Sequence, residues 1–182
     1  MTQLVTPRLL LREFRPSDFA DFRAWDSDPE VQRYELGRPS VEAESRFFFE
    51  QILRTNQENP RARWRFAITL RPDDRAIGRI SLSVSNDRIH EYEIGWTVRR
   101  DLWGQGLATE AAHAVIGMAF SRLNAHRVIA YCHVDNLASQ RVMRKLGMSP
   151  EGYFHEALWI NNRWWDELSF AILDREFTRS DP

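Results

Sequence analysis

The most informative part of the chain reads Trp103-Gly104-Gln105-Gly106-Leu107-Ala108-Thr109-Glu110-Ala111. It follows a strand candidate at residues 91–98 and opens a helix in which small apolar residues recur at helical spacing as far as Ala119. The first amides of a helix have no partners within it and lie at the positive end of its dipole, and glycine lets the backbone approach a ligand closely. The pattern therefore predicts a seat for a phosphate group. The alternative is that the two glycines only turn the chain.

Two other phosphate-binding motifs are excluded. A dinucleotide-binding fingerprint needs a third glycine at position 109, where the chain has Thr109. A P-loop needs Gly-Lys followed by Ser or Thr, whereas the one lysine of the chain, Lys145, belongs to a different predicted helix. Any phosphate at Gly104 and Gly106 must therefore be held in another way, by the backbone amides of this helix start.

Around this segment, the chain reads as a mixture of strands and helices within one domain, residues 1–182. Strands are predicted at residues 4–14, 65–70, 76–84, 91–98, 127–134, 152–158 and 165–173, and helices at residues 18–25, 40–56, 107–119 and 136–147. Ser40 and Asn136 are the expected N-caps, and Gly147 is the expected left-handed C-cap. Asn161-Asn162-Arg163 is the expected hairpin turn. The pattern predicts an α/β (α+β) fold with a mixed sheet of about seven strands and about four helices.

The composition excludes several classes of protein. With 43% apolar residues, the chain can bury a sizeable core, so it is not a disordered tail. The single cysteine, Cys132, excludes internal disulfides, and we expect it to be buried and inert. A net charge of −1 gives no global attraction to nucleic acid, although a local patch at Arg61, Arg63 and Arg65 leaves that alternative open. No signal-peptide core or membrane-length apolar run is found, so a cytoplasmic location is expected.

The segment at residues 103–111 resembles motif A of the GNAT acetyltransferases, and most closely the branch of the RimJ/RimL-like ribosomal-protein N-terminal acetyltransferases. Other stretches resemble that branch in the same order: Thr6-Pro7-Arg8-Leu9-Leu10-Leu11-Arg12, Glu93-Ile94-Gly95-Trp96, the segment from Asn136 to Met148, Glu151-Gly152 and Trp165-Asp166. One departure is Asp101, where the superfamily pattern has Gln or Arg three residues before the first glycine.

The resemblance implies a mostly antiparallel GNAT-like sheet, splayed between its fourth and fifth predicted strands, and acetyl-CoA as the acetyl donor. The pyrophosphate would lie on the amides of Trp103, Gly104, Gln105, Gly106, Leu107, Ala108 and Thr109, and Thr109 would also offer its hydroxyl. The pantetheine arm would pair with the backbone of Trp96 and Val98, and Gly95 is placed where a bulge would open the sheet. Asn136 would hydrogen-bond the arm, unless it serves only as a helix cap.

Transfer of an acetyl group to an amine needs the neutral form of that amine, so a base must accept a proton. We expect Glu93, flanked by Tyr92 and Trp96, to be this base with a raised pKa. Ser139 would protonate the departing thiolate. Tyr131 is a further catalytic candidate.

Other side chains have both functional and structural interpretations. His133 and Tyr153 are alternative acid–base groups, although each is more often structural on a strand. Trp159, Trp164 and Trp165 either wall the acceptor pocket or cover the end of the sheet. The five histidines include no His-x-x-x-His pair, so no metal is expected.

The resemblance therefore implies an N-acetyltransferase that moves an acetyl group from acetyl-CoA to a primary amine. Direct attack is expected, because no nucleophile–base pair for a covalent intermediate is evident. The acceptor stays open among a protein N-terminus, an amino acid, a polyamine and an aminoglycoside, and the protein would be a monomer or a homodimer without a membrane partner. The alternative is a non-catalytic acyl-CoA-binding or regulatory module of the same fold.

Overall fold

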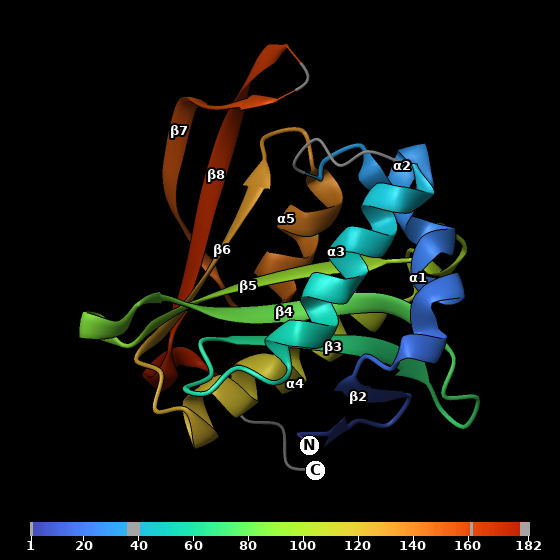
Figure 1. Cartoon of the computed structure of the whole chain (residues 1–182). Helices are drawn as coiled ribbons and strands as arrows, with labels where there is room; N and C mark the ends of the chain where they lie inside the picture. The colour runs from blue at the N-terminus through green and yellow to red at the C-terminus, as the bar shows by residue number, and fades with distance from the viewer. Residues whose placement is uncertain (1, 36–40, 161, 179–182) are drawn as a thin grey trace.

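The computed structural model describes residues 2–35, 41–160 and 162–178. These residues form one eight-stranded sheet in the order β1-β2-β3-β4-β5-β6-β8-β7 (Figure 1). The strands are β1 (Leu4–Val5), β2 (Leu9–Glu13), β3 (Arg63–Leu70), β4 (Ala76–Asn86), β5 (Glu91–Val98), β6 (Arg127–His133), β7 (Ser149–Ile160) and β8 (Arg163–Leu173). Only β5 and β6 pair in parallel, and the other neighbours are antiparallel. The predicted mixed, mostly antiparallel sheet is confirmed.

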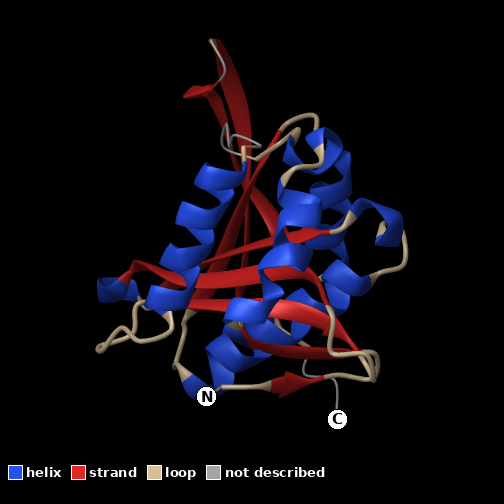
Figure 2. Ribbon diagram, turned by 45° about the vertical axis from the view of Figure 1, so that its right-hand side comes forward, coloured by secondary structure: helices blue, strands red, loops and turns tan. Residues whose placement is uncertain are grey.

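Five α-helices cover the two faces of the sheet in the described residues (Figures 1 and 2). They are α1 (Phe19–Asp26), α2 (Pro29–Gln32), α3 (Glu42–Thr55), α4 (Leu107–Arg122) and α5 (Leu137–Lys145). Helices α1 to α3 pack on one face over an aromatic cluster centred on Phe22, Trp25 and Phe49. Helices α4 and α5 pack on the other face, where the alanines of α4 allow the helix to lie close to the sheet. The chain therefore buries one core on each side of the sheet.

The first predicted strand is divided into β1 and β2. Pro7 has no amide hydrogen and interrupts the strand, and the amide of Thr6 instead donates to the carbonyl of Leu9 at 2.9 Å. This division makes eight strands of the predicted seven. The additional helix is α2, a single turn that was not among the predicted helices, and it is capped by Asp28, which accepts from the amide of Glu30.

The expected caps have mixed outcomes. Asn136 accepts from the amide of Ser139 at 3.0 Å, and Gly147 has φ +79°, so both ends of α5 are as predicted. Helix α3 begins at Glu42 with Val41 at the N-cap position. Ser40, the expected cap of this helix, and Asn161 of the expected hairpin turn lie outside the described residues.

Asp18 directly precedes α1, but its side chain makes no hydrogen bond that caps this helix. Its carboxylate binds the guanidinium of Arg12 with oxygen–nitrogen distances of 2.7 and 2.9 Å, and both side chains are buried. Arg12 also donates to Asp74 in the β3–β4 turn at 2.7 Å. The buried guanidinium of Arg12 therefore joins β2, the turn before α1 and the β3–β4 turn.

The candidate basic patch is not a continuous charged surface. Arg61 forms an ion pair with Glu13 at 2.7 Å, and Arg65 lies over the ring of Phe48, 5.5 Å from its centroid. Trp64 between them is buried. Within the parts of the chain that the structure covers, no helix is both long and apolar enough to cross a membrane.

Candidate active site

The sheet opens between its two parallel strands. β5 and β6 are registered at Glu91 with Arg127, at Tyr92 with Val128 and at Glu93 with Ile129, and the described pairing stops there. Beyond these positions β5 continues along β4, whereas β6 continues along β8 (Figure 1). The predicted splay between the fourth and fifth predicted strands is therefore present, here between β5 and β6.

The open edge of β5 exposes alternate backbone groups. The amide of Arg99 donates to the carbonyl of Ile77 in β4 at 2.8 Å. Because hydrogen-bonded and non-hydrogen-bonded pairs alternate in an antiparallel ladder, Trp96 and Val98 direct their amides and carbonyls into the gap. The carbonyl of Val98 already accepts from the indole N–H of Trp103 at 2.7 Å. The amide and carbonyl of Trp96 and the amide of Val98 are thus available for strand pairing.

Gly95 does not form the predicted bulge. It is regularly registered with Ser81 of β4, and the irregularity of this ladder lies between Val84 and Asn86. A Cβ at Gly95 would meet the hydroxyl of Ser81 at 3.5 Å, an ordinary contact. The sheet opens because β6 turns away to pair with β8, and no extra residue in β5 is needed.

The start of α4 has the geometry of an anion seat. Gly104 and Gly106 have φ values of +78° and +79°, a region that favours glycine, and no heavy atom lies within 4 Å of a Cβ built on Gly104. Gly106 is the N-cap residue and has no side chain that could occupy the first amides of the helix. The first helical hydrogen bond runs from the amide of Glu110 to the carbonyl of Gly106, so the amides of residues 107–109 have no partners within the helix.

The helix start is fixed by the N-terminal strands. The carboxylate of Glu110 accepts from the Thr6 hydroxyl at 2.6 Å, from the Arg8 amide at 2.9 Å and from Arg8 Nε at 2.6 Å. Arg8 also donates to the carbonyl of Gln105 at 3.0 Å. Burial raises the pKa of Glu110, but the hydrogen bonds from Thr6 and Arg8 outweigh burial and lower the pKa below its usual value. Asp101 is bound to Arg99 at 2.7 Å, outside this arrangement.

A cavity of about 210 Å³ passes through the gap between β5 and β6. Asn136, Ser139 and Met143 line it from α5, on one face of the sheet. Tyr34 and Glu35, which follow α2, line it from the opposite face. The opening therefore connects the two faces, so a donor and an acceptor can approach from opposite sides.

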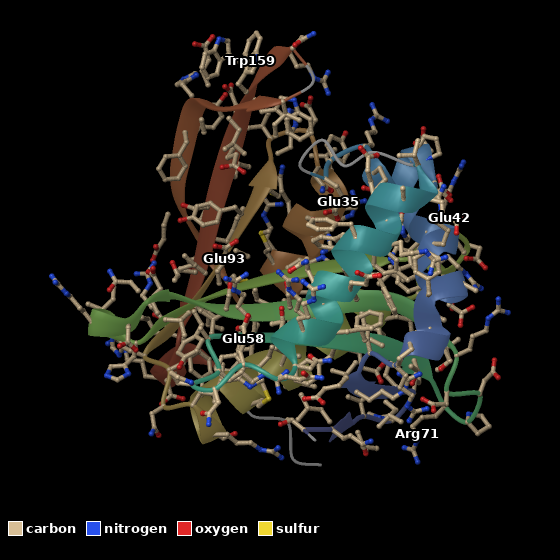
Figure 3. All side chains as sticks on the ribbon, viewed as in Figure 1. Glu35, Glu42, Glu58, Arg71, Glu93 and Trp159 are labelled. Carbon is tan, nitrogen blue, oxygen red and sulfur yellow. The ribbon has the colours of Figure 1, made fainter. Side chains whose placement is uncertain are left out.

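Glu93 lines this cavity, but its neighbours differ from those expected. Successive strand residues point to opposite faces, so Tyr92 and Trp96 lie across the sheet from Glu93. Figure 3 shows Glu93 and Glu35 on the side of the sheet that α3 covers. Burial, together with the negative charge of Glu91, raises the pKa of Glu93. The raised pKa agrees with the prediction, whereas the flanking aromatic residues do not cause it.

Tyr131 and Glu167 share the face of Glu93. Glu93 is registered with Ile129 of β6, and Tyr131 and His133 follow on the same face of that strand. Glu167 of β8 is registered with His133 and therefore lies on this face too. Burial raises the pKa of Glu167, and the charge of Glu93 raises it further. Burial and both carboxylates raise the pKa of Tyr131. Glu167 was not among the residues predicted from the sequence. It lies two residues after Trp165 on the same predicted strand, so strand alternation puts both side chains on one face.

The end of the cavity at Tyr34 and Glu35 is held by polar and aromatic contacts. Glu35 accepts from the Thr97 hydroxyl at 2.6 Å and from Arg79 at 2.7 Å. Tyr34 stacks on His133 with ring centroids 5.4 Å apart. Nδ1 of His133 accepts from the amide of Asp135 at 3.0 Å, which fixes that nitrogen as an acceptor. Neither Glu35 nor Tyr34 carries a motif that marks it in the sequence.

The other candidate residues divide between the two faces. Ser139 lines the cavity beside the Asn136 cap, and Cys132 lies in its buried wall, where burial raises the thiol pKa to about 11. Tyr153 is registered with Leu168, on the face opposite Glu167, and its hydroxyl donates to Asp166. Tyr153 therefore lies outside the cavity.

The three tryptophans also separate. Trp165 is buried and lines the cavity, whereas Trp159 and Trp164 are exposed and pack edge to face, 5.1 Å apart. They are paired near the end of the β7–β8 hairpin, where Figure 3 labels Trp159. Trp165 alone among them is positioned to wall a pocket. In the described ranges, no three His, Cys, Asp or Glu side chains are grouped as metal ligands.

Comparisons with known proteins agree with this geometry. A family model described as "Acetyltransferase (GNAT) domain" matches residues 8–149. An uncharacterized N-acetyltransferase of Bacillus subtilis, YnaD, is 36% identical over 174 residues, covering 96% of this chain and 98% of its own. A GNAT-family acetyltransferase structure from Bacillus anthracis is 32% identical, with a TM-score of 0.85 over 96% of this chain and all of that one (100%). Mycobacterium smegmatis RimJ, solved in complex with CoA-disulfide, has the same fold, with a TM-score of 0.85 at 22% identity over 98% of this chain and 89% of that one.

Proposed function

The chain belongs to the GNAT acetyltransferase family and is an acetyl-CoA-dependent acetyltransferase, and from this premise we propose that residues 1–182 act as one domain that acetylates a primary amine in the cavity between β5 and β6. The observation that carries this proposal is the divergence of the two strands after Glu93 and Ile129. It places unpaired strand backbone beside a row of ionisable side chains. The amine belongs either to a protein N-terminus or to a small molecule.

Two features fit acetyl-CoA on the α4 and α5 side of the sheet. The amides of residues 107–109, which have no partners within α4 and lie at its positive end, suit a pyrophosphate together with the amides of Gly104, Gln105 and Gly106. The amide of Trp103, which the resemblance also implied as a contact, already donates to the carbonyl of Arg100 at 3.1 Å. The amide and carbonyl of Trp96 suit an extended, amide-rich pantetheine arm that pairs like an added strand, while Val98 offers its amide alone. Asn136 borders the same cavity, but its side-chain oxygen is already used as a cap.

Glu93 is the proposed base on the other side of the opening. Its raised pKa suits a carboxylate that accepts a proton near neutral pH, directly from the amine or through a water molecule. Tyr131 lies on the same face, but its raised pKa keeps the phenol protonated near neutral pH, so Tyr131 suits a proton donor rather than the base. As the amine nitrogen bonds to the thioester carbonyl carbon, the amine proton passes to Glu93.

Ser139 is the proposed acid for the leaving group. When the bond between the carbonyl carbon and the sulfur breaks, the thiolate takes a proton from the Ser139 hydroxyl, which is then restored from solvent. Cys132 also borders the cavity, but a thiol with a pKa of about 11 is protonated at neutral pH. Direct transfer therefore needs no covalent enzyme intermediate.

Thiol release from acetyl-CoA tests the proposal. We expect release that depends on an amine from a panel of peptides, amino acids, polyamines and aminoglycosides, together with acetyl-CoA binding in calorimetry. Binding with no release for any amine would instead support a non-catalytic acyl-CoA-binding module. Absence of binding would overturn both functions.

A further inference from the structure

Arg8 has a cationic side chain beside the first turn of α4. Its Nη2 atom lies 3.7 Å from the position that a Cβ on Gly106 would occupy. Gly106 is the N-cap residue, and the amides of residues 107–109 that follow it have no partners within the helix. The guanidinium of Arg8 therefore lies at the edge of the proposed pyrophosphate seat.

One nitrogen of this guanidinium is unused. Arg8 Nε donates to Glu110 at 2.6 Å and Nη1 donates to the carbonyl of Gln105 at 3.0 Å, whereas Nη2 makes no hydrogen bond within the described ranges. The side chain is 49% exposed even though two of its nitrogens are bonded to the protein. The donors of Nη2 are therefore open to a ligand.

The two bonds to the protein also hold the guanidinium of Arg8 in one orientation. A side chain that is already ordered loses little conformational freedom when a ligand binds, so a new hydrogen bond contributes more to affinity. The planar guanidinium matches the geometry of phosphate oxygens, and a hydrogen bond between charged groups is about twice as strong as a neutral one. Arg8 is thus prearranged to bind a phosphate.

The loop before the seat does not supply such a donor from Arg99 or Asp101. Arg99 donates to both carboxylate oxygens of Asp101, at 2.7 and 2.9 Å. An ionised carboxylate has no donor of its own, so Asp101 cannot bind a phosphate directly. Arg8, which comes from the N-terminal strands, can supply the side-chain donor that position 101 lacks.

We propose that Arg8 is a cofactor-binding residue, whose Nη2 donates to a pyrophosphate oxygen of acetyl-CoA while Nε and Nη1 stay bonded to Glu110 and Gln105. This inference rests on the proposed function and on its placement of the pyrophosphate at the start of α4. The 3′-phosphate of the coenzyme offers the same chemistry, but Nη2 lies beside the N-cap residue, where the pyrophosphate is placed.

A change of Arg8 alone would also uncover the charge of Glu110, which by itself would repel a phosphate. The test is therefore made in the Glu110→Gln background, where neither the ion pair nor the carboxylate is present. Calorimetry measures CoA affinity for Glu110→Gln and for Glu110→Gln combined with Arg8→Met. We expect the double variant to bind CoA at least about tenfold more weakly, as for a lost charge-assisted hydrogen bond.

Arg122 gives the matched control for net charge. It is exposed at the C-terminal end of α4, so Arg122→Met in the same background removes an equal charge far from the seat. Its CoA affinity should stay within about twofold, because solvent and salt screen a distant surface charge. Equal losses in the two double variants would indicate long-range attraction and overturn the contact with Arg8.

Glu110→Gln alone separates a direct donor from a structural role, even if the Arg8 variant does not fold. We expect it to bind CoA at least as tightly as the native protein, because it removes a negative charge near the phosphate and leaves the guanidinium. If Glu110→Gln instead bound CoA more weakly, the ion pair would act by positioning α4, and the direct contact would be overturned.

Two further ligands locate the contact. Dephospho-CoA lacks the 3′-phosphate and should lose as much affinity as CoA when Arg8 is changed, whereas pantetheine lacks every phosphate and should lose none. A loss confined to CoA would assign Arg8 to the 3′-phosphate, and an equal loss for pantetheine would leave it a structural residue; either result would overturn the proposal. If the native protein bound none of the three ligands, the proposed function itself would fail.

Discussion

Arg8 and Glu110, 102 residues apart in the chain, are joined by a bond of 2.6 Å from Nε to Oε2, and the backbone amide of Arg8 donates to the same carboxylate. The sequence shows these two residues only as parts of separate segments. Their contact fastens the start of β2 to the first turn of α4, beside the proposed pyrophosphate seat. The position of this helix start therefore depends on the N-terminal strands.

Glu110→Gln should destabilise the fold by about 1–2 kcal/mol at pH 7, since it weakens charge-assisted hydrogen bonds to a half-exposed arginine. The folded-state pKa of Glu110 is lowered, so its contribution is present above the unfolded-state pKa and is lost as the pH falls through the folded-state value. Melting temperatures of the two proteins should thus converge between pH 7 and acid pH. A constant difference across that range would contradict an ionic role for Glu110.

Gly106→Asp should weaken acetyl-CoA binding at least about tenfold, because it places a negative charge at the proposed pyrophosphate seat. Gly106→Asn is the matched control, since asparagine has nearly the same shape and also tolerates positive φ. Both variants should lose some stability, and calorimetry should separate their affinities. Equal affinities for acetyl-CoA would place the pyrophosphate elsewhere.

Ser139→Ala should lower kcat about tenfold or more while acetyl-CoA affinity is little changed, as expected for a lost proton donor. The Asn136 cap bonds the backbone amide of Ser139, which alanine retains, so melting should be nearly unchanged. Asn136→Ala removes that cap and should cost about 1 kcal/mol of stability. Normal turnover by Ser139→Ala would show that Ser139 does not donate the proton and has only a structural role at the start of α5.

Glu93→Gln should lower kcat/KM for the amine most below about pH 8, and the difference should narrow at higher pH, where more of the amine is already neutral. A buried carboxyl with a raised pKa loses stability as the pH rises from its unfolded-state pKa to its folded-state pKa, so the glutamine variant should melt at or above the native temperature at pH 7. Acetyl-CoA affinity should be retained.

Glu167→Gln is the comparison for this pH profile, because Glu167 shares the face and the raised pKa of Glu93. We expect Glu167→Gln to leave the pH dependence of kcat/KM for the amine unchanged in shape. If Glu167→Gln flattened the profile and Glu93→Gln did not, the base would be Glu167. If neither variant altered the pH profile, deprotonation of the amine in bulk water would account for the reaction.

Local patterns predicted most of the fold. The strand at Glu91–Val98, the glycines at 104 and 106, the alanine stripe of α4 and both ends of α5 depend on residues near each other in the chain, so their spacing is informative. The resemblance to the GNAT family is confirmed, and the separation of β5 and β6 was predicted from that resemblance. The expected bulge at Gly95 is wrong, because the separation arises from the path of β6.

The parts of the site that the sequence did not reveal depend on distant pairing. Glu167 and Trp165 reach the cavity only because β8 lies beside β6, and Glu35 is placed by contacts with β4 and β5. Strand alternation does predict that Glu93 and Trp96 point to opposite faces, so the expected aromatic neighbours of Glu93 contradicted a local rule. The contact of Arg8 with Glu110 has no local pattern at all.

The strand order also has a consequence for synthesis. β2, β3, β4 and β5 each pair with the strand made just before, so this half of the sheet can assemble as the chain emerges from the ribosome. β6 then has only three registered positions on β5, and its long antiparallel neighbour is β8, which is made after β7. The wall of the cavity that holds Tyr131, Glu167 and Trp165 is therefore completed late, when translation has passed Leu173.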